Sequence, residues 1–345
     1  MEQNIFQFIW FLLWGVLWVV YFMLDGFDFG VGMLLPFIAK NDTERRIMYN
    51  AVGPFWDGNE VWLITAGGAT FAAFPTTYAV MFSSLYTPLL LILFALIVRG
   101  VAFEFRGKEE SFLWKTVWDI CLVVGSFVPS LLFGVAFANF FKGLPIDANG
   151  IMHGNTLTLL NPYGLIGGLL FVLMFVVHGA VWLCVKTNGD LQKRARKVAE
   201  VFWVLEVVLA LVFLVASAFA TDLWANYMKY KFLLIIPAIA LVAYFAIPAF
   251  LIQGKNWYAW FSSCAAIVFT VAFGLAGLFP RLIPSSLNPE WSLTIYNSSS
   301  SPLTLKVMTV VALIFVPLVI AYQIWAYKLF SEKVRPAFLE SEEAY

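Results

Sequence analysis

Two acidic residues inside a hydrophobic stretch are the first candidates for chemistry. Residues 53–63 read Gly-Pro-Phe-Trp-Asp-Gly-Asn-Glu-Val-Trp-Leu, and the apolar run that begins there continues to residue 74. Asp57 and Glu60 are three residues apart, so they share one face of a helix. Because ionised carboxylates are costly inside a membrane, the pair indicates a site that holds or passes protons. The alternative is an acid pair buried against Arg or Lys of a neighbouring helix, with a packing role only.

A second acid pair precedes the first. Residues 24–32 read Leu-Asp-Gly-Phe-Asp-Phe-Gly-Val-Gly, and Asp25 and Asp28 are again three apart. The glycines at 26 and 30 would let another helix approach closely. Asp25 and Asp28 are therefore candidates for proton uptake. The alternative is a helix end at the membrane surface, with these acids paired to Arg45 or Arg46.

The composition indicates that these motifs lie in a membrane. Of the 345 residues, 62% are hydrophobic and only 12% charged, with 35 Phe and 14 Trp, which a water-soluble domain would not tolerate. The net charge of zero argues against nucleic-acid binding. The three cysteines form no CxxC pair, which argues against a disulfide scaffold or a metal site.

The predicted fold class is an all-α polytopic membrane protein with nine transmembrane helices. A span needs about 20 apolar residues, and nine such runs are found: 7–27, 52–74, 78–98, 117–137, 163–184, 199–220, 232–252, 257–278 and 305–327. The most basic connection, residues 186–197, separates two halves. We expect a mobile, charged tail from residue 331 to residue 345.

The orientation follows from the basic residues. Sixteen of the 21 Lys and Arg residues lie in one set of alternating connections and five in the other. Connections rich in Lys and Arg are usually cytoplasmic. This places the N-terminus outside, the C-terminus in the cytoplasm, and both acid pairs towards the cytoplasmic side.

Other polar residues in or beside the apolar runs are compatible with more than one role. Arg99 could be the counter-ion of Asp57 or Glu60, and Asp119 is expected at a solvated helix start. Glu206 is isolated in an apolar run and could have a functional or a packing role. His178 is expected to be a hydrogen-bonded interior residue, and the alternative is a haem ligand.

The combination of the motifs at 24–32 and 53–63, in the first two of nine expected helices, resembles subunit II of cytochrome bd-type quinol oxidases. The resemblance extends over the whole chain in length and helix number. It implies a bacterial terminal oxidase of the inner membrane that reduces dioxygen to water with electrons from membrane quinol. It also implies two four-helix bundles, residues 1–140 and 141–304, with a peripheral helix and cytoplasmic tail in residues 305–345.

The resemblance further implies a division of labour between two subunits. Subunit I would carry two b-type haems and one d-type haem, and this chain would be its partner in a heterodimer, binding no haem or metal itself. Membrane quinol, O2 and lipid are the other implied partners. A structural quinone and small single-helix accessory subunits are compatible with the resemblance.

The resemblance also implies roles for individual residues that match the family's motifs by position. Asp57 matches the acid at the entrance of a cytoplasmic proton route, and Asp25 and Asp28 match further acids of the first motif. Glu60 extends this acidic group, and Trp62 matches an aromatic residue near the entry of oxygen from the lipid.

Two other functions are compatible with the same residues. A proton-coupled secondary transporter would require a binding site near the membrane midplane and symmetric inverted halves, whereas here the acids are off-centre. A purely structural subunit would tolerate replacement of Asp57.

Overall fold

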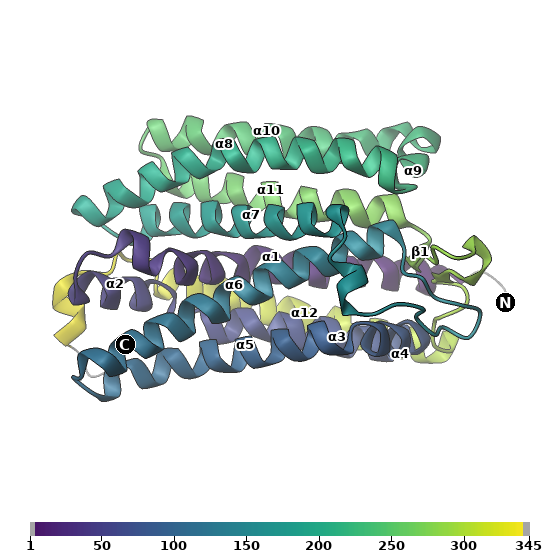
Figure 1. The fold of residues 1–345 in the computed structure, drawn as a ribbon, viewed down its shortest axis with the longest axis horizontal. Coiled ribbons are helices and arrows are strands. Elements are labelled where there is room, and N and C mark those ends of the chain that lie inside the picture. Colours follow the sequence, from purple (N-terminus) through teal and green to yellow (C-terminus); the bar gives the residue numbers. More distant parts are fainter. Residues whose placement is uncertain (1–3, 341–345) are drawn as a thin grey trace.

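The computed structural model describes residues 4–340, and its long helices run side by side in one elongated array (Figure 1). The helices and strands, with η marking 3-10 helices, are α1 (Ile5–Ile38), α2 (Asp42–Val52), α3 (Trp56–Ala73), α4 (Pro75–Ser84), α5 (Tyr86–Phe105), η1 (Arg106–Lys108), α6 (Phe112–Lys142), η2 (Thr156–Leu159), α7 (Pro162–Lys186), α8 (Gly189–Ala220), α9 (Leu223–Lys229), η3 (Lys231–Leu234), α10 (Ile235–Ile252), α11 (Asn256–Leu278), β1 (Arg281–Ile283), η4 (Pro289–Trp291), β2 (Leu293–Thr294), α12 (Pro302–Leu329) and η5 (Pro336–Glu340).

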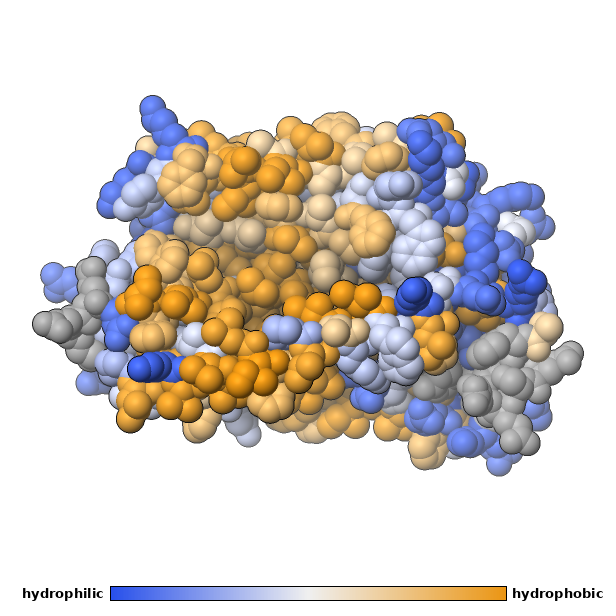
Figure 2. All heavy atoms as spheres, turned by 180° about the vertical axis from the view of Figure 1, so that it is seen from behind, coloured by the Kyte–Doolittle hydropathy of each residue, from blue (hydrophilic) through white to orange (hydrophobic). Residues whose placement is uncertain are grey.

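Eight helices among the described residues are long and apolar enough to cross a membrane: α1, α5, α6, α7, α8, α10, α11 and α12. Figure 2 shows a belt of hydrophobic residues across the middle of one face, with hydrophilic residues gathered at both ends. The polytopic all-α prediction is therefore confirmed. Helix α3 is not among the eight, since its first two turns carry Asp57, Asn59 and Glu60.

The centre of the array is formed by α1 and α7. Helix α1 packs against α3, α6, α7, α11 and α12, and α7 is the most buried of the eight long apolar helices. The two helices touch through glycines, because a Cβ added to Gly30 would lie 1.8 Å from the Phe175 carbonyl oxygen. A Cβ added to Gly179 would lie 2.5 Å from the Gly30 carbonyl carbon. Only glycine allows this approach.

Two expected spans differ from the structure. Helix α1 continues to Ile38, well past the expected end at residue 27, so Asp25 and Asp28 lie inside the helix. The expected span 78–98 is divided into α4 and α5, which meet at Leu85. Pro88 has no amide hydrogen to donate to the preceding turn, which accounts for the break.

Charged residues hold α2 against the ends of α5 and α6. Arg106 Nε lies 2.7 Å from Asp119 Oδ1, and Arg45 Nη1 lies 2.8 Å from Asp119 Oδ2. Asp119 is therefore a buried ion-pair partner, and its prediction as a solvated helix start is wrong. Burial alone would raise the pKa of Asp42, but the hydrogen bonds and charges of Arg106 and Lys115 hold that pKa below its usual value.

We refer to this end of the array as the α2 end (Figure 1). The predicted mobile tail is also held here as far as residue 340, since Arg46 Nη2 donates to the Leu339 carbonyl at 2.8 Å. Leu339 is itself buried. Residues 341–345 of the expected tail lie outside the described residues. The opposite end carries the short β1–β2 pair and the loops around it.

Replacing Gly30 with Ala should destabilise the packing of α1 on α7, because the new methyl group would overlap the Phe175 carbonyl. Overpacking of this kind typically costs about 1–3 kcal/mol. We expect a lower unfolding temperature of the purified protein, followed by circular dichroism. Gly107→Ala is the matched control, since no atom would lie within 4 Å of its Cβ. Equal unfolding temperatures for the two variants would contradict the close contact.

Candidate functional site

A buried arginine brings the predicted acids of two other helices together. Arg99, on α5, is 0% exposed, and its Nη2 lies 2.7 Å from Asp25 Oδ1 on α1. The same nitrogen lies 3.3 Å from Glu60 Oε2 on α3. The guanidinium also covers the Phe29 ring, 4.2 Å from its centroid. A charge at this depth is tolerated only when it is paired, and here two carboxylates pair with it.

Asp28 lies next to this cluster and is bonded to an amide. Asn59 Nδ2 donates to Asp28 Oδ2 at 2.8 Å and to the Leu24 carbonyl at 3.2 Å. Tyr327, on α12, donates its hydroxyl hydrogen to Asn59 Oδ1 at 2.9 Å. The Asn59 amide therefore connects α1, α3 and α12, and its orientation is determined by partners on both sides.

The cluster contains more acids than bases. Asp25, Asp28 and Glu60 supply three carboxyl groups, and Arg99 is the cation that contacts them. One guanidinium cannot balance three carboxylates in a medium of low dielectric constant, so the group can hold protons. Asp25 Oδ2, Asp28 Oδ1 and the Tyr21 hydroxyl are buried, and the side chains of Tyr21 and Asp28 both lie close enough to Asp25 to interact with it. Neighbouring carboxyl and hydroxyl groups of this kind can exchange protons.

Asp57 lies apart from the buried cluster. It is exposed in the first turn of α3, where the helix dipole favours a negative charge. The expectation that Arg99 is a counter-ion is confirmed for Glu60, while Asp57 has no part in that ion pair. The alternative that Arg45 or Arg46 pairs with Asp25 is wrong, because α1 continues to Ile38 and places both arginines beyond the cluster.

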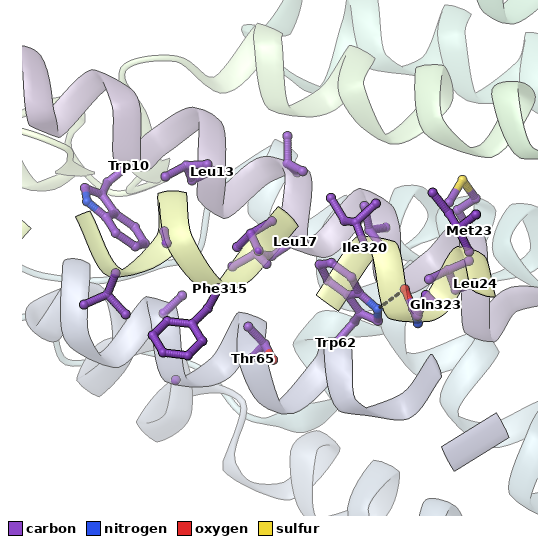
Figure 3. Close-up of a pocket in the computed structure, with 18 of the residues that line it drawn as sticks. Trp10, Leu13, Leu17, Met23, Leu24, Trp62, Thr65, Phe315, Ile320 and Gln323 are labelled. Atoms are coloured by element: carbon purple, nitrogen blue, oxygen red, sulfur yellow. Dashed lines mark hydrogen bonds between the residues drawn. The ribbon is translucent and has the colours of Figure 1, made fainter. Parts of the chain in front are cut away.

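Trp62 lies on the wall of an apolar groove (Figure 3). The groove has a volume of about 910 Å³ and runs between α1, α3, α11 and α12. Trp62 Nε1 donates to Gln323 Oε1 of α12 at 3.0 Å, which orients the indole ring. Apart from Gln323 and Thr65, the residues labelled around this groove have no polar group free to bind a polar ligand, and the surface suits apolar molecules.

His178 has hydrogen-bond partners at both ring nitrogens. Nδ1 lies 2.7 Å from Ser263 Oγ, and Nε2 lies 2.9 Å from the Met23 carbonyl oxygen. Since a carbonyl only accepts, Nε2 carries a hydrogen. The expectation of a hydrogen-bonded interior residue is confirmed. Within residues 4–340, His, Cys, Asp and Glu form no group of three or more that could hold a metal ion.

Glu206 is separate from the acid cluster. It is 2% exposed on α8, and its Oε2 has no hydrogen-bond partner in the described part of the chain. The structure therefore does not join it to the predicted proton site.

Sequence reasoning missed the contribution of the last long helix. Gln323 and Tyr327 contact Trp62 and Asn59 respectively. The two residues are four apart on an otherwise apolar helix, so they share a face. That spacing is a signal that could have identified them.

Comparisons with known proteins identify the family of this chain. A family model described as cytochrome bd terminal oxidase subunit II matches residues 6–330. The chain is 40% identical to the cytochrome bd ubiquinol oxidase subunit 2 of Bacillus subtilis, over 94% of this chain and 96% of that protein. It is 38% identical to the cytochrome bd-I ubiquinol oxidase subunit 2 of Escherichia coli, over 94% of each chain.

A solved structure of a bd oxidase from Geobacillus thermodenitrificans has the same fold, with a TM-score of 0.77 at 17% identity. The superposition covers 95% of this chain and 99% of that one. With the family match over nearly the whole chain, this protein belongs to the cytochrome bd terminal oxidase subunit II family.

Proposed function

We propose that this chain supports a haem-bearing subunit I in a quinol:O2 oxidoreductase and supplies part of the proton route and oxygen access of that complex. The complex would reduce dioxygen to water with electrons from membrane quinol in aerobic respiration. The observation that carries the proposal is the ion pairing of buried Arg99 with buried Asp25 and half-buried Glu60, with buried Asp28 beside them. Groups of this kind inside a membrane are typical of proton pathways.

The order of the proton route follows from exposure and contacts. Reduction of one dioxygen to two waters consumes four electrons and four protons. Asp57 is exposed and takes up the proton, and Glu60 lies three residues further along α3. Glu60 shares Arg99 with Asp25, and Asp28 follows one helical turn later on α1. The steps from Asp57 through Glu60 to Asp25 lead inward from the surface, and Asp28 lies beside Asp25 on the side of the α2 end.

Oxygen access uses the apolar groove behind Trp62. Dioxygen is apolar and concentrates in lipid, so it needs an apolar path and no polar recognition. The groove between α1, α3, α11 and α12 supplies such a path, and its size also suits a lipid chain or the tail of a structural quinone.

The histidine within the long helices is not free to hold the haems implied by the family. Both ring nitrogens of His178 are already hydrogen-bonded. A histidine that ligates iron must present a free ring nitrogen. We therefore assign the two b-type haems and the d-type haem to subunit I and derive no step through haem in this chain.

The membrane topology forms part of the proposal. We assign α3 as a ninth span, with the N-terminus outside and the α2 end in the cytoplasm of a bacterial inner membrane. The basic residues at this end support the orientation. Residues 1–140 and 141–304 would each form a four-helix bundle, and α12 would be peripheral.

The exposed face of α3 is the surface we assign to subunit I. Asp57, Val61 and Ile64 are exposed on one side of the helix, and added Cβ atoms at Gly58 and Gly67 would meet nothing within 4 Å. Open glycines allow another helix to approach closely. A partner helix can therefore cover this face beyond Asp57, which stays open to water for proton uptake.

Replacing Asp57 with Asn tests the proton route. We expect quinol-driven oxygen consumption of the purified complex to fall at least tenfold, about 1.4 kcal/mol in the limiting barrier, with haem spectrum and subunit content unchanged. Asp190→Asn, which removes another exposed acid, should have no effect. Normal turnover in Asp57→Asn would remove the proton route and leave a purely structural subunit.

Replacing Ile64 with Trp tests the partner surface. A larger side chain on a tightly covered face of α3 should prevent docking, so we expect less subunit I and less haem in affinity-purified samples. Val208→Trp, on the exposed side of α8, is the matched control and should assemble normally. Full assembly of the Ile64→Trp variant would show that this face of α3 is not in the interface.

A further inference from the structure

Helix α12 carries residues of the site but is the least buried of the eight long apolar helices. Among the described residues, the polar contacts between α12 and the other helices are near the ends of α12. Trp10 Nε1 donates to the Leu305 carbonyl at one end, and Gln323 and Tyr327 contact α3 near the other. Between these contacts, the apolar groove lies between α12 and helices α1, α3 and α11 (Figure 3). The Tyr327 ring packs against Phe27, Trp182 and Trp260, and the hold on the last turn of α12 is a further constraint on its position.

A buried lysine holds that turn. Lys186, the last residue of α7, is 2% exposed, and its Nζ donates to the carbonyl oxygens of Phe330 and Glu332. In return, the Val334 amide donates to the Lys186 carbonyl at 2.8 Å. Phe330 is the C-cap of α12, so the ammonium lies where the helix dipole is negative. The segment after α12 is thus tied to α7 by bonds in both directions.

The lysine is also connected to the site through aromatic rings. Its Nζ lies 5.6 Å from the centroid of Phe55, within the range of a cation–π contact. The Phe55 ring centroid lies 4.6 Å from that of Tyr327. The Phe55 carbonyl accepts the amide hydrogen of Asn59, so Phe55 belongs to the turn that presents Asn59.

We infer that Lys186 is a positioning residue for the acid cluster, acting through Tyr327 and Asn59. Lys186 fixes the end of α12, which keeps the Tyr327 hydroxyl on Asn59 Oδ1. That bond directs the Asn59 NH2 group towards Asp28, where it donates to the carboxyl oxygen. Without Tyr327, the amide oxygen loses its donor, and only the bonds of the NH2 group to Asp28 and to the Leu24 carbonyl hold its orientation. The consequence for turnover rests on the proposed proton route.

Lys333 provides a matched control in the same segment. Its Nζ donates to Asn188 Oδ1 at 2.9 Å, but the contact is exposed and involves no atom of α12. Lys186→Met and Lys333→Met each remove one lysine charge from a contact that involves the segment after α12. Only the first should disturb Tyr327.

The experiment compares Lys186→Met, Lys186→Arg, Lys333→Met, Tyr327→Phe and the Lys186→Met/Tyr327→Phe double variant in the assembled complex. Quinol-driven turnover is measured as a function of pH, and hydrogen exchange is measured for peptides covering residues 330–340. We expect Lys186→Met and Tyr327→Phe each to lower turnover about fivefold (about 1 kcal/mol) and to shift its pH dependence in the same direction. The double variant should be no worse than the more impaired single variant.

Hydrogen exchange of residues 330–340 should rise in Lys186→Met and remain unchanged in Tyr327→Phe. Lys186→Arg should restore most of the turnover, and Lys333→Met should retain all of it. If Lys186→Met does not assemble, Val334→Pro serves instead, because it removes the amide that donates to the Lys186 carbonyl. It should show the same effects on turnover and exchange.

Two results would overturn the inference alone: effects of Lys186→Met and Tyr327→Phe that multiply in the double variant, or normal turnover in Lys186→Met despite faster exchange. In either case, an impaired Asp57→Asn variant would leave the proton route intact. Normal turnover in both Asp57→Asn and Tyr327→Phe would instead overturn the proposed function, and with it the role of Lys186.

Discussion

The burial of the Arg99 guanidinium between α1, α3 and α5 is the constraint on which the other features of the site depend. A fully buried cation needs nearby carboxylates, and Asp25 and Glu60 meet that need from two different helices. The three helices must therefore keep one register relative to each other. Any sliding of α3 or α5 along α1 would leave a charge unpaired in a medium that cannot solvate it. The same constraint brings acids from separate motifs within reach of one another.

The polarity of α3 has the same origin. Its first two turns carry Asp57, Asn59 and Glu60, so it lacks the hydropathy of the other long helices. Asn59 and Glu60 have partners inside the chain, on α1, α5 and α12, whereas Asp57 faces outward. On one side of α3 the polar residues are bonded within the chain, and on the other side a polar residue is exposed. A helix of this kind is expected to lie between two protein surfaces. This is the physical basis for assigning a partner to that face.

Helix α12 shows how a weakly buried element can still take part in a buried site. The groove leaves much of the helix without contact to the body, so hydrophobic packing contributes less to its position than it does for α1 or α7. Directional bonds near its ends substitute for packing. Lys186 supplies such bonds at the α2 end, to main-chain carbonyls at and beyond the end of the helix.

The sequence by itself determined the class of protein, the approximate position of most spans and the acidic residues of the candidate site. These properties depend on residue type and local spacing: long apolar runs require a membrane, and acids three residues apart share a helix face. Local spacing also explains the errors. Helix α1 extends past residue 27 because its later residues are buried by α7 and other helices, and the tail is held by Lys186 and Arg46, which are distant in sequence.

Only the tertiary structure decided which acids meet. Arg99 could have paired with Asp57 or Glu60, and the packing of α1, α3 and α5 selected Glu60 and added Asp25. The roles of Tyr327 and Lys186 arise from contacts between segments more than 100 residues apart, Tyr327 with Asn59 and Lys186 with Phe330. No local spacing pattern in the sequence marks such contacts, because they depend on how whole helices pack against one another.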